Sequence, residues 1–96
     1  MALDSNAPMS SVDLAAVMRQ AWQDVEAGKL DQALAAARQV LQHDPQHADA
    51  HYMSGLLLQQ AGHSAEALEH LDRAVAANPS VADYHFIAAE MRRAMK

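Results

Sequence analysis

The six histidines are the residues of this 96-residue chain best suited to chemistry near neutral pH. They are His43, His47, His51, His63, His70 and His85. His47 and His51 have the i, i+4 spacing of two metal ligands on one helix, with Asp49 between them. Pro45, however, places His47 before or at the start of the expected helix, so the two rings do not share a face. A tight zinc site needs three or four converging ligands, and the chain has no cysteine, so we expect no metal site.

The carboxylates likewise form no catalytic arrangement. Glu66 and Glu69 lie beside His70 and Arg73 on one predicted helix, as two i, i+4 pairs. Such surface pairs stabilise a helix by about 0.2–0.5 kcal/mol each, which accounts for these residues without catalysis. No nucleophile–base–acid pattern and no glycine-rich phosphate loop occurs in the sequence. We therefore expect a protein that is not an enzyme and that needs no cofactor.

The composition excludes some classes of partner and predicts the fold class. The formal net charge of -5 argues against nucleic acid, whose binders usually carry a basic stripe. Much of the hydrophobic content is alanine and only 4% of the residues are aromatic, which favours helices over strands. No apolar run approaches the roughly 18 residues of a membrane span, and the N-terminus does not resemble a signal peptide. We expect an all-α protein that is soluble, binds no membrane and, by default, is cytoplasmic.

A period of 34 residues runs through the chain, as the shift from Gly28 to Gly62 shows. Ala33, Leu34 and Pro45 recur as Ala67, Leu68 and Pro79, and residues 48–53 return in similar form as residues 82–87. A fixed period in this range indicates a stack of identical supersecondary units. The period therefore predicts a right-handed α-solenoid of antiparallel helical hairpins.

The apolar spacing and the breakers predict five helices. The first begins near Ser10 or Ser11 and stops before Gly28, and the second runs from about 31 to 43 with Asp31 as its N-cap. The third covers about 48–60, the fourth is capped by Ser64 and ends before Asn78, and the fifth covers about 81–95. We expect residues 1–9 to be disordered and residues 10–96 to form one domain. Its repeats cover about 14–47 and 48–81, with a partial third repeat at 82–96.

These features resemble the tetratricopeptide repeat family. Its pattern has a small residue midway along the first helix, a glycine at the turn, alanines on the second helix and a closing proline. The corresponding residues here are Ala21, Gly55 and Ala89; Gly28 and Gly62; Ala33, Val40, Ala67 and Ala74; and Pro45 and Pro79. The resemblance covers residues 14–96 and implies a protein-binding adaptor.

In proteins of this family the first helix of each repeat lines a concave groove that receives a peptide or a helix. Mapping that face onto this chain selects Met18, Trp22, Val25, Tyr52, Leu56, Gln59, Phe86, Glu90 and Arg93, with Asp49 at its edge. The resemblance implies that this strip binds an apolar peptide or an amphipathic helix. Trp22 and Phe86 also fit core positions by periodicity, and both interpretations stay open.

Two alternatives fit the same sequence. The chain is also compatible with a homo-oligomerisation or structural domain, including one cut from a longer protein or enzyme. Small bacterial tetratricopeptide chaperones for secreted helical subunits are similar in size and in their apolar groove. None of these interpretations names a partner.

Overall fold

The computed structural model describes residues 11–95, and five helices account for most of them. They are α1 (Ser11–Glu26), α2 (Leu30–His43), α3 (Ala48–Gln60), α4 (Ser64–Ala77) and α5 (Ala82–Ala94). No strand occurs between residues 11 and 95, so the predicted all-α class is confirmed. The segment expected to be disordered, residues 1–9, lies outside the described residues.

Glycine and proline end the helices as the sequence predicts. Gly28 and Gly62 have φ values of 81° and 91°, a left-handed conformation that costs glycine little. After Gly28, the backbone N–H of Lys29 donates to the carbonyl oxygen of Asp24 at 2.8 Å, which satisfies a carbonyl at the helix end. The α2 and α4 helices end instead just before Asp44 and Asn78, which directly precede Pro45 and Pro79. A residue before proline is disfavoured in the helical conformation.

The predicted N-caps of two helices are wrong. Asp31 and Ser64 lie inside the first turns of α2 and α4, whose N-caps are Lys29 and His63. Neither of these residues caps its helix with a side-chain hydrogen bond. The glycine turn leads into the next helix within two residues, so each helix begins before Asp31 or Ser64 is reached.

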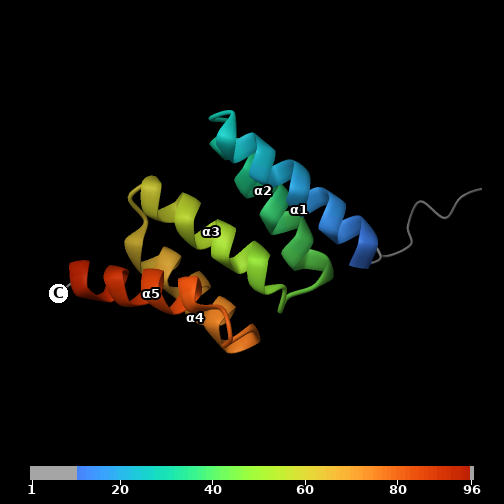
Figure 1. The fold of residues 1–96 in the computed structure, drawn as a ribbon. Helices are drawn as coiled ribbons and strands as arrows, with labels where there is room; N and C mark the ends of the chain where they lie inside the picture. The colour runs from blue at the N-terminus through green and yellow to red at the C-terminus, as the bar shows by residue number, and fades with distance from the viewer. Residues whose placement is uncertain (1–10, 96) are drawn as a thin grey trace, which may run out of the picture.

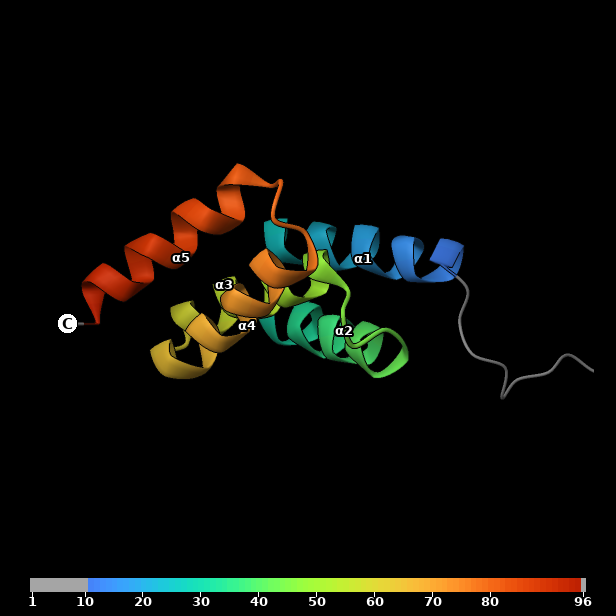
Figure 2. The ribbon, with the colours of Figure 1, turned by 90° about the horizontal axis from the view of Figure 1, so that it is seen from below.

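The helices form two antiparallel hairpins, α1–α2 and α3–α4, and α5 packs beside α4 (Figure 1). Turning the molecule shows α1 and α5 on one side and α2 and α4 on the other (Figure 2). The α3 helix is central, because it contacts both α2 and α4.

The buried apolar residues form two clusters that meet at α3. The first joins α1, α2 and α3 through Leu14, Met18, Ala21, Ala33, Ala37, Val40, Ala50, Met53 and Leu57. The second joins α3, α4 and α5 through Leu58, Ala67, Leu71, Ala88 and Met91. Alanines make up a large part of both clusters, so the helices approach closely with few bulky side chains between them.

The α3 and α4 helices approach closely at Gly55 on α3. A Cβ atom at this position would lie 2.7 Å from Cγ of Leu71 and 3.1 Å from the carbonyl oxygen of Ala67. Ala21 of α1 and Ala37 of α2 hold the corresponding positions of the first hairpin by the 34-residue period, and both are fully buried in the first core cluster. The corresponding positions of the two hairpins are therefore filled by different residues, glycine and leucine in one and two alanines in the other.

A pair of histidines joins α3 to α4. His51 Nε2 lies 2.7 Å from the carbonyl oxygen of Pro45, which can only accept, so Nε2 carries a hydrogen. His51 Nδ1 lies 3.0 Å from His70 Nδ1, and with both rings neutral His70 donates to His51. Burial lowers the pKa of His70, and its neighbour His51 lowers it further. His51 is thus a helix–helix packing residue, whereas the equivalent His85 bonds the Pro79 carbonyl but is exposed.

We expect Gly55→Ala to destabilise the fold by about 1–3 kcal/mol, because the added methyl group overlaps Leu71. In a double-mutant cycle, Gly55→Ala should cost less in a Leu71→Ala background, which reproduces the Ala21–Ala37 pair of the first hairpin. Urea unfolding of the unmodified chain, the two single variants and the double variant measures the coupling free energy between positions 55 and 71. Additive losses would show that the crossing does not depend on this contact.

We expect the free energy of unfolding to fall as the pH drops below about 6.5. The folded pKa of His70 lies below its unfolded value, so the neutral ring contributes stability above pH 6.5. This contribution is lost as the pH falls through the folded pKa. Other charges facing His70 are Glu66, which opposes the shift, and Arg73 and Arg38, which support it.

Urea unfolding between pH 5 and 8 checks this dependence with two variants. His70→Gln should flatten it, because glutamine can still donate to His51 but does not titrate. His63→Gln, at an exposed position whose side chain makes no capping bond, should leave it unchanged. Equal slopes for His70→Gln and the unmodified chain would contradict the assignment.

Candidate interaction surface

Three aromatic side chains form a row across α1, α3 and α5. The ring centroids of Trp22 and Tyr52 are 6.1 Å apart, and those of Tyr52 and Tyr84 are 4.8 Å apart. The rings are tilted by 47° and 40°, within the range of favourable aromatic pairs. Trp22 and Tyr52 are half-buried, while Tyr84 is buried. The row links three helices that are not consecutive in the sequence.

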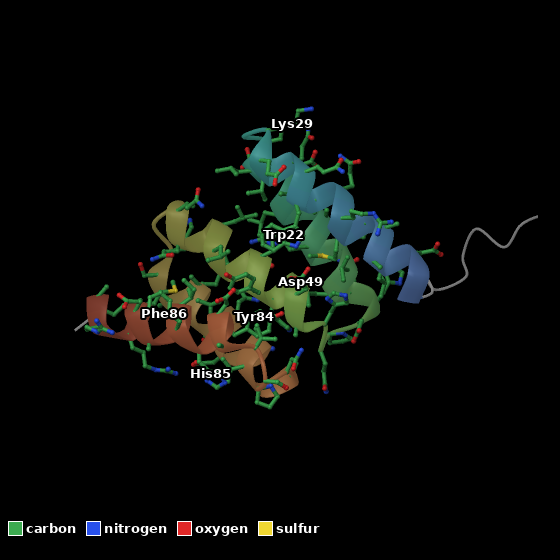
Figure 3. The ribbon with its side chains drawn as sticks, viewed as in Figure 1. Trp22, Lys29, Asp49, Tyr84, His85 and Phe86 are labelled. Atoms are coloured by element: carbon green, nitrogen blue, oxygen red, sulfur yellow. The ribbon has the colours of Figure 1, made fainter. Side chains whose placement is uncertain are left out.

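A carboxylate fixes one end of this row. Trp22 Nε1–H donates to Oδ2 of Asp49 at 2.9 Å, between α1 and α3 (Figure 3). Asp49 lies in the first turn of α3, where a negative charge also interacts favourably with the helix dipole. The indole is therefore held in one orientation by a charge-assisted hydrogen bond.

The electrostatic environment of the row is negative. Burial raises the pKa of Tyr52, and the carboxylates of Asp83 and Asp49 raise it further. Burial also raises the pKa of Tyr84, with added contributions from Asp49 and Tyr52. Both phenols therefore stay protonated near neutral pH. The surface presents aromatic rings beside carboxylates, a combination that suits an apolar segment carrying a basic side chain.

The strip residues selected from the sequence differ in exposure. Phe86 is 62% exposed, and Gln59 and Arg93 are also exposed. Trp22, Val25, Asp49, Tyr52, Leu56 and Glu90 are half-buried. Arg93 lies 3.3 Å from Glu90 in an ion pair on α5. Trp22 packs against the first core cluster while also bonding Asp49, so it has both a core and a surface role.

The expected exposure of Met18 is wrong. Its side chain is 4% exposed and belongs to the first core cluster. Met18 has the same repeat position as Tyr52 and Phe86, but it is buried in the first core cluster together with Leu14 and Ala21. The repeat position therefore fixes which helix a residue occupies and not how deeply it is buried.

Tyr84 is the residue of this row that the sequence did not indicate. It has the repeat position of Ala50, a small and fully buried residue, so the period alone favoured a core role. A tyrosine replacing a buried alanine was the available signal, because its ring must extend beyond the space that alanine fills. In the structure the ring extends toward Tyr52.

Other kinds of site find less support in the part of the chain that is described. No group of three or more potential ligands there could hold a metal ion. An open pocket of about 310 Å³ is lined by Pro45, Gln46, His51, Arg73, Ala76 and Ala77, none of which is a predicted strip residue. No helix among residues 11–95 is long and apolar enough to cross a membrane.

Paired helices at a 34-residue period, with small residues at their crossings, identify a repeat architecture, and residues 24–90 match the sequence model of the tetratricopeptide repeat. The chain belongs to the tetratricopeptide repeat family. A search among curated proteins found no match. Tetratricopeptide repeats generally mediate protein–protein interactions and are generally not enzymes, and this is the level of function that the family supplies.

We expect Asp49→Ala to destabilise this tetratricopeptide chain by about 1–2 kcal/mol, because it removes the acceptor of Trp22 Nε1–H. Asp49→Asn should cost less, since the amide oxygen still accepts. Asp83→Ala removes the equivalent first-turn acid of α5, so its loss measures what the helix dipole alone contributes to the free energy of unfolding. Urea unfolding followed by the emission of Trp22, the single tryptophan, gives all three values. Equal losses for Asp49→Ala and Asp83→Ala would argue against the bond.

Proposed function

We propose that this tetratricopeptide chain is an adaptor that binds an apolar peptide or an amphipathic helix of another protein. The binding surface is the face of α1, α3 and α5 that carries Trp22, Tyr52, Leu56 and Phe86. The observation that supports this most is the aromatic row, because it places the half-buried rings of Trp22 and Tyr52 side by side on α1 and α3 and continues to α5 through the buried ring of Tyr84. Aromatic anchors of this kind supply most of the affinity of many protein interfaces.

Leu56 and Phe86 are the apolar residues of this surface with the most freedom to contact a partner. Leu56 is half-buried and packs in neither core cluster, although it lies on the central helix. Phe86 is largely exposed, which is unusual for a large aromatic side chain without a partner. Burying both against a ligand would remove apolar surface from water at no cost to the core.

Polar groups around the rings would determine the position of the ligand along the surface and which ligand charge is preferred. Gln59 and Arg93 are exposed at the ends of α3 and α5. Asp49 and Asp83 lie at the opposite ends of these two helices, close enough to Tyr52 to raise its pKa. We therefore expect a preference for ligands with a lysine or an arginine next to their apolar anchors.

A displayed library of 16-residue peptides, selected on the intact chain, tests this surface. Leu56→Ala and Phe86→Ala should each weaken the selected peptides about 10-fold or more, because they remove apolar anchors. Val75→Ala changes a half-buried aliphatic residue on α4 that lies outside the surface and packs in neither core cluster, so it is the control and should change affinity little. Calorimetric titration gives the affinities, and circular dichroism verifies the fold of each variant.

If the selected peptides bound Leu56→Ala and Phe86→Ala as tightly as the unmodified chain, this surface would not be the binding site. A stronger effect of Val75→Ala than of Leu56→Ala would move the site to the side of α2 and α4.

A further inference from the structure

Four side chains in and beside the aromatic row carry oxygen atoms that have no hydrogen-bond partner. The carboxylate of Asp83 and the hydroxyls of Tyr52 and Tyr84 form no hydrogen bond or ion pair with any residue between 11 and 95. Asp49 uses Oδ2 to accept from Trp22, which leaves Oδ1 without a donor in the same part of the chain. Two helices contribute, because α3 supplies Asp49 and Tyr52 and α5 supplies Asp83 and Tyr84.

The hydroxyl of Tyr84 is the least expected of these groups. Tyr84 is 7% exposed, and its ring packs against that of Tyr52. Buried hydroxyls are usually hydrogen-bonded, because an unpaired one costs free energy. Among residues 11–95, Ser54 Oγ is the fully enclosed side-chain oxygen that lacks a partner. The Tyr84 oxygen is unpaired but not enclosed, so the hydroxyl reaches the surface beside Asp49 and is available to a ligand (Figure 3).

The charges that act on the two phenols are negative. Burial raises the pKa of Tyr52 most, and Asp83 and Asp49 raise it further. Burial likewise raises the pKa of Tyr84, with added contributions from Asp49 and Tyr52. Both carboxylates therefore lie within electrostatic reach of Tyr52, one from each helix, and no basic side chain among residues 11–95 contributes to either change. A cationic group of a ligand would complement this charge.

The combination of rings and carboxylates favours a guanidinium over an ammonium group. A guanidinium is planar, donates through five N–H groups, stacks on aromatic rings and is weakly hydrated. An ammonium group has three donors and loses more hydration when it leaves water. The ring of Tyr52 is half-buried and lies 6.1 Å from that of Trp22, so it exposes part of its surface to such a group. Carboxylate oxygens beside the ring would accept strong, charge-assisted hydrogen bonds from the guanidinium.

We propose that an arginine side chain of the bound protein occupies a site formed by these four residues, Asp49, Tyr52, Asp83 and Tyr84. Its guanidinium donates to both carboxylates and to the Tyr84 hydroxyl, and it lies against the ring of Tyr52. The Trp22–Asp49 bond persists, because it uses Oδ2 and leaves Oδ1 to the ligand. That the arginine belongs to a bound protein segment rests on the proposed function, whereas the site itself also accepts a free arginine derivative.

Peptides selected on the intact chain from the displayed library of 16-residue peptides provide one test. In the tightest-binding peptide, each arginine in turn is replaced by citrulline, which has a similar shape without the charge, and by lysine. At one arginine, citrulline should weaken binding about 10-fold or more and lysine about 3-fold or more. Calorimetric titration measures these affinities.

Two variants of the chain assign the effect to this site. Asp83→Asn and Tyr84→Phe should each weaken the arginine peptide about 5-fold and leave the affinity of the citrulline peptide unchanged. Tyr84→Phe should also leave the free energy of unfolding unchanged, since the hydroxyl has no partner within residues 11–95. Asp31→Asn changes an exposed first-turn acid of α2, a helix without a residue of the aromatic row, and is the matched control for Asp83→Asn.

A small probe tests the site without a peptide. N-acetyl-arginine amide, titrated to about 50 mM at constant ionic strength, should shift the NMR signals of the Trp22 indole N–H and the Tyr84 backbone amide. N-acetyl-citrulline amide, the uncharged analogue, should shift neither signal. Asp83→Asn should remove the response to the arginine probe, and Asp31→Asn should keep it.

The outcomes distinguish this site from the proposed function. Peptides that need Leu56 and Phe86 but bind equally well with citrulline, or that contain no arginine, would overturn the arginine site and leave the proposed function standing. Tighter binding of the lysine peptide would overturn the choice of a guanidinium. If no selected peptide binds this surface, the proposed function fails and the arginine probe decides. A response that Asp83→Asn removes then supports the site, and no response overturns it.

Discussion

Close packing of helices through small side chains is the constraint on which this structure depends. With few aromatic residues and many alanines, the chain cannot fill wide gaps between helices, so the helices must approach one another closely. Ala33, Ala37 and Ala67 allow this approach, and Gly55 allows one that has no space for a Cβ atom. The corresponding positions hold alanine and alanine in the first hairpin and glycine and leucine in the second, so the second hairpin places a larger side chain against a residue that has none. Each crossing is thus fitted to its own hairpin although the backbone plan is repeated.

Polar side chains then tie together parts of the chain that are distant in sequence. The Pro45 carbonyl, His51 and His70 form a chain of hydrogen bonds from the turn between the hairpins into α4. On the other side of α3, Asp49 holds the Trp22 indole. Because buried donors and acceptors are costly to leave unpaired, both sets of bonds favour one register of the hairpins. The aromatic row depends on that register, since its rings come from three separate helices.

The candidate surface could be predicted in part. The period placed Trp22, Tyr52 and Phe86 on the first helix of each repeat, and all three expose some surface. It failed for Met18, which is buried in the first core cluster. It also gave no sign of the contact between Tyr84 and Tyr52. The 34-residue period indicates the position of a residue within its repeat, whereas the burial of that residue depends on which helices pack against the repeat.

The sequence by itself determined the helices, their order and their antiparallel pairing. These follow from local causes: left-handed glycines, residues before proline, and links too short for any other connection. The tertiary structure decided which side chains are exposed and which meet. The Trp22–Asp49 bond, the His51–His70 pair and the different exposures of Gly55 and Ala89 all arise between helices. Such contacts depend on the distance and rotation of one helix against another, and no pattern within a single helix encodes them.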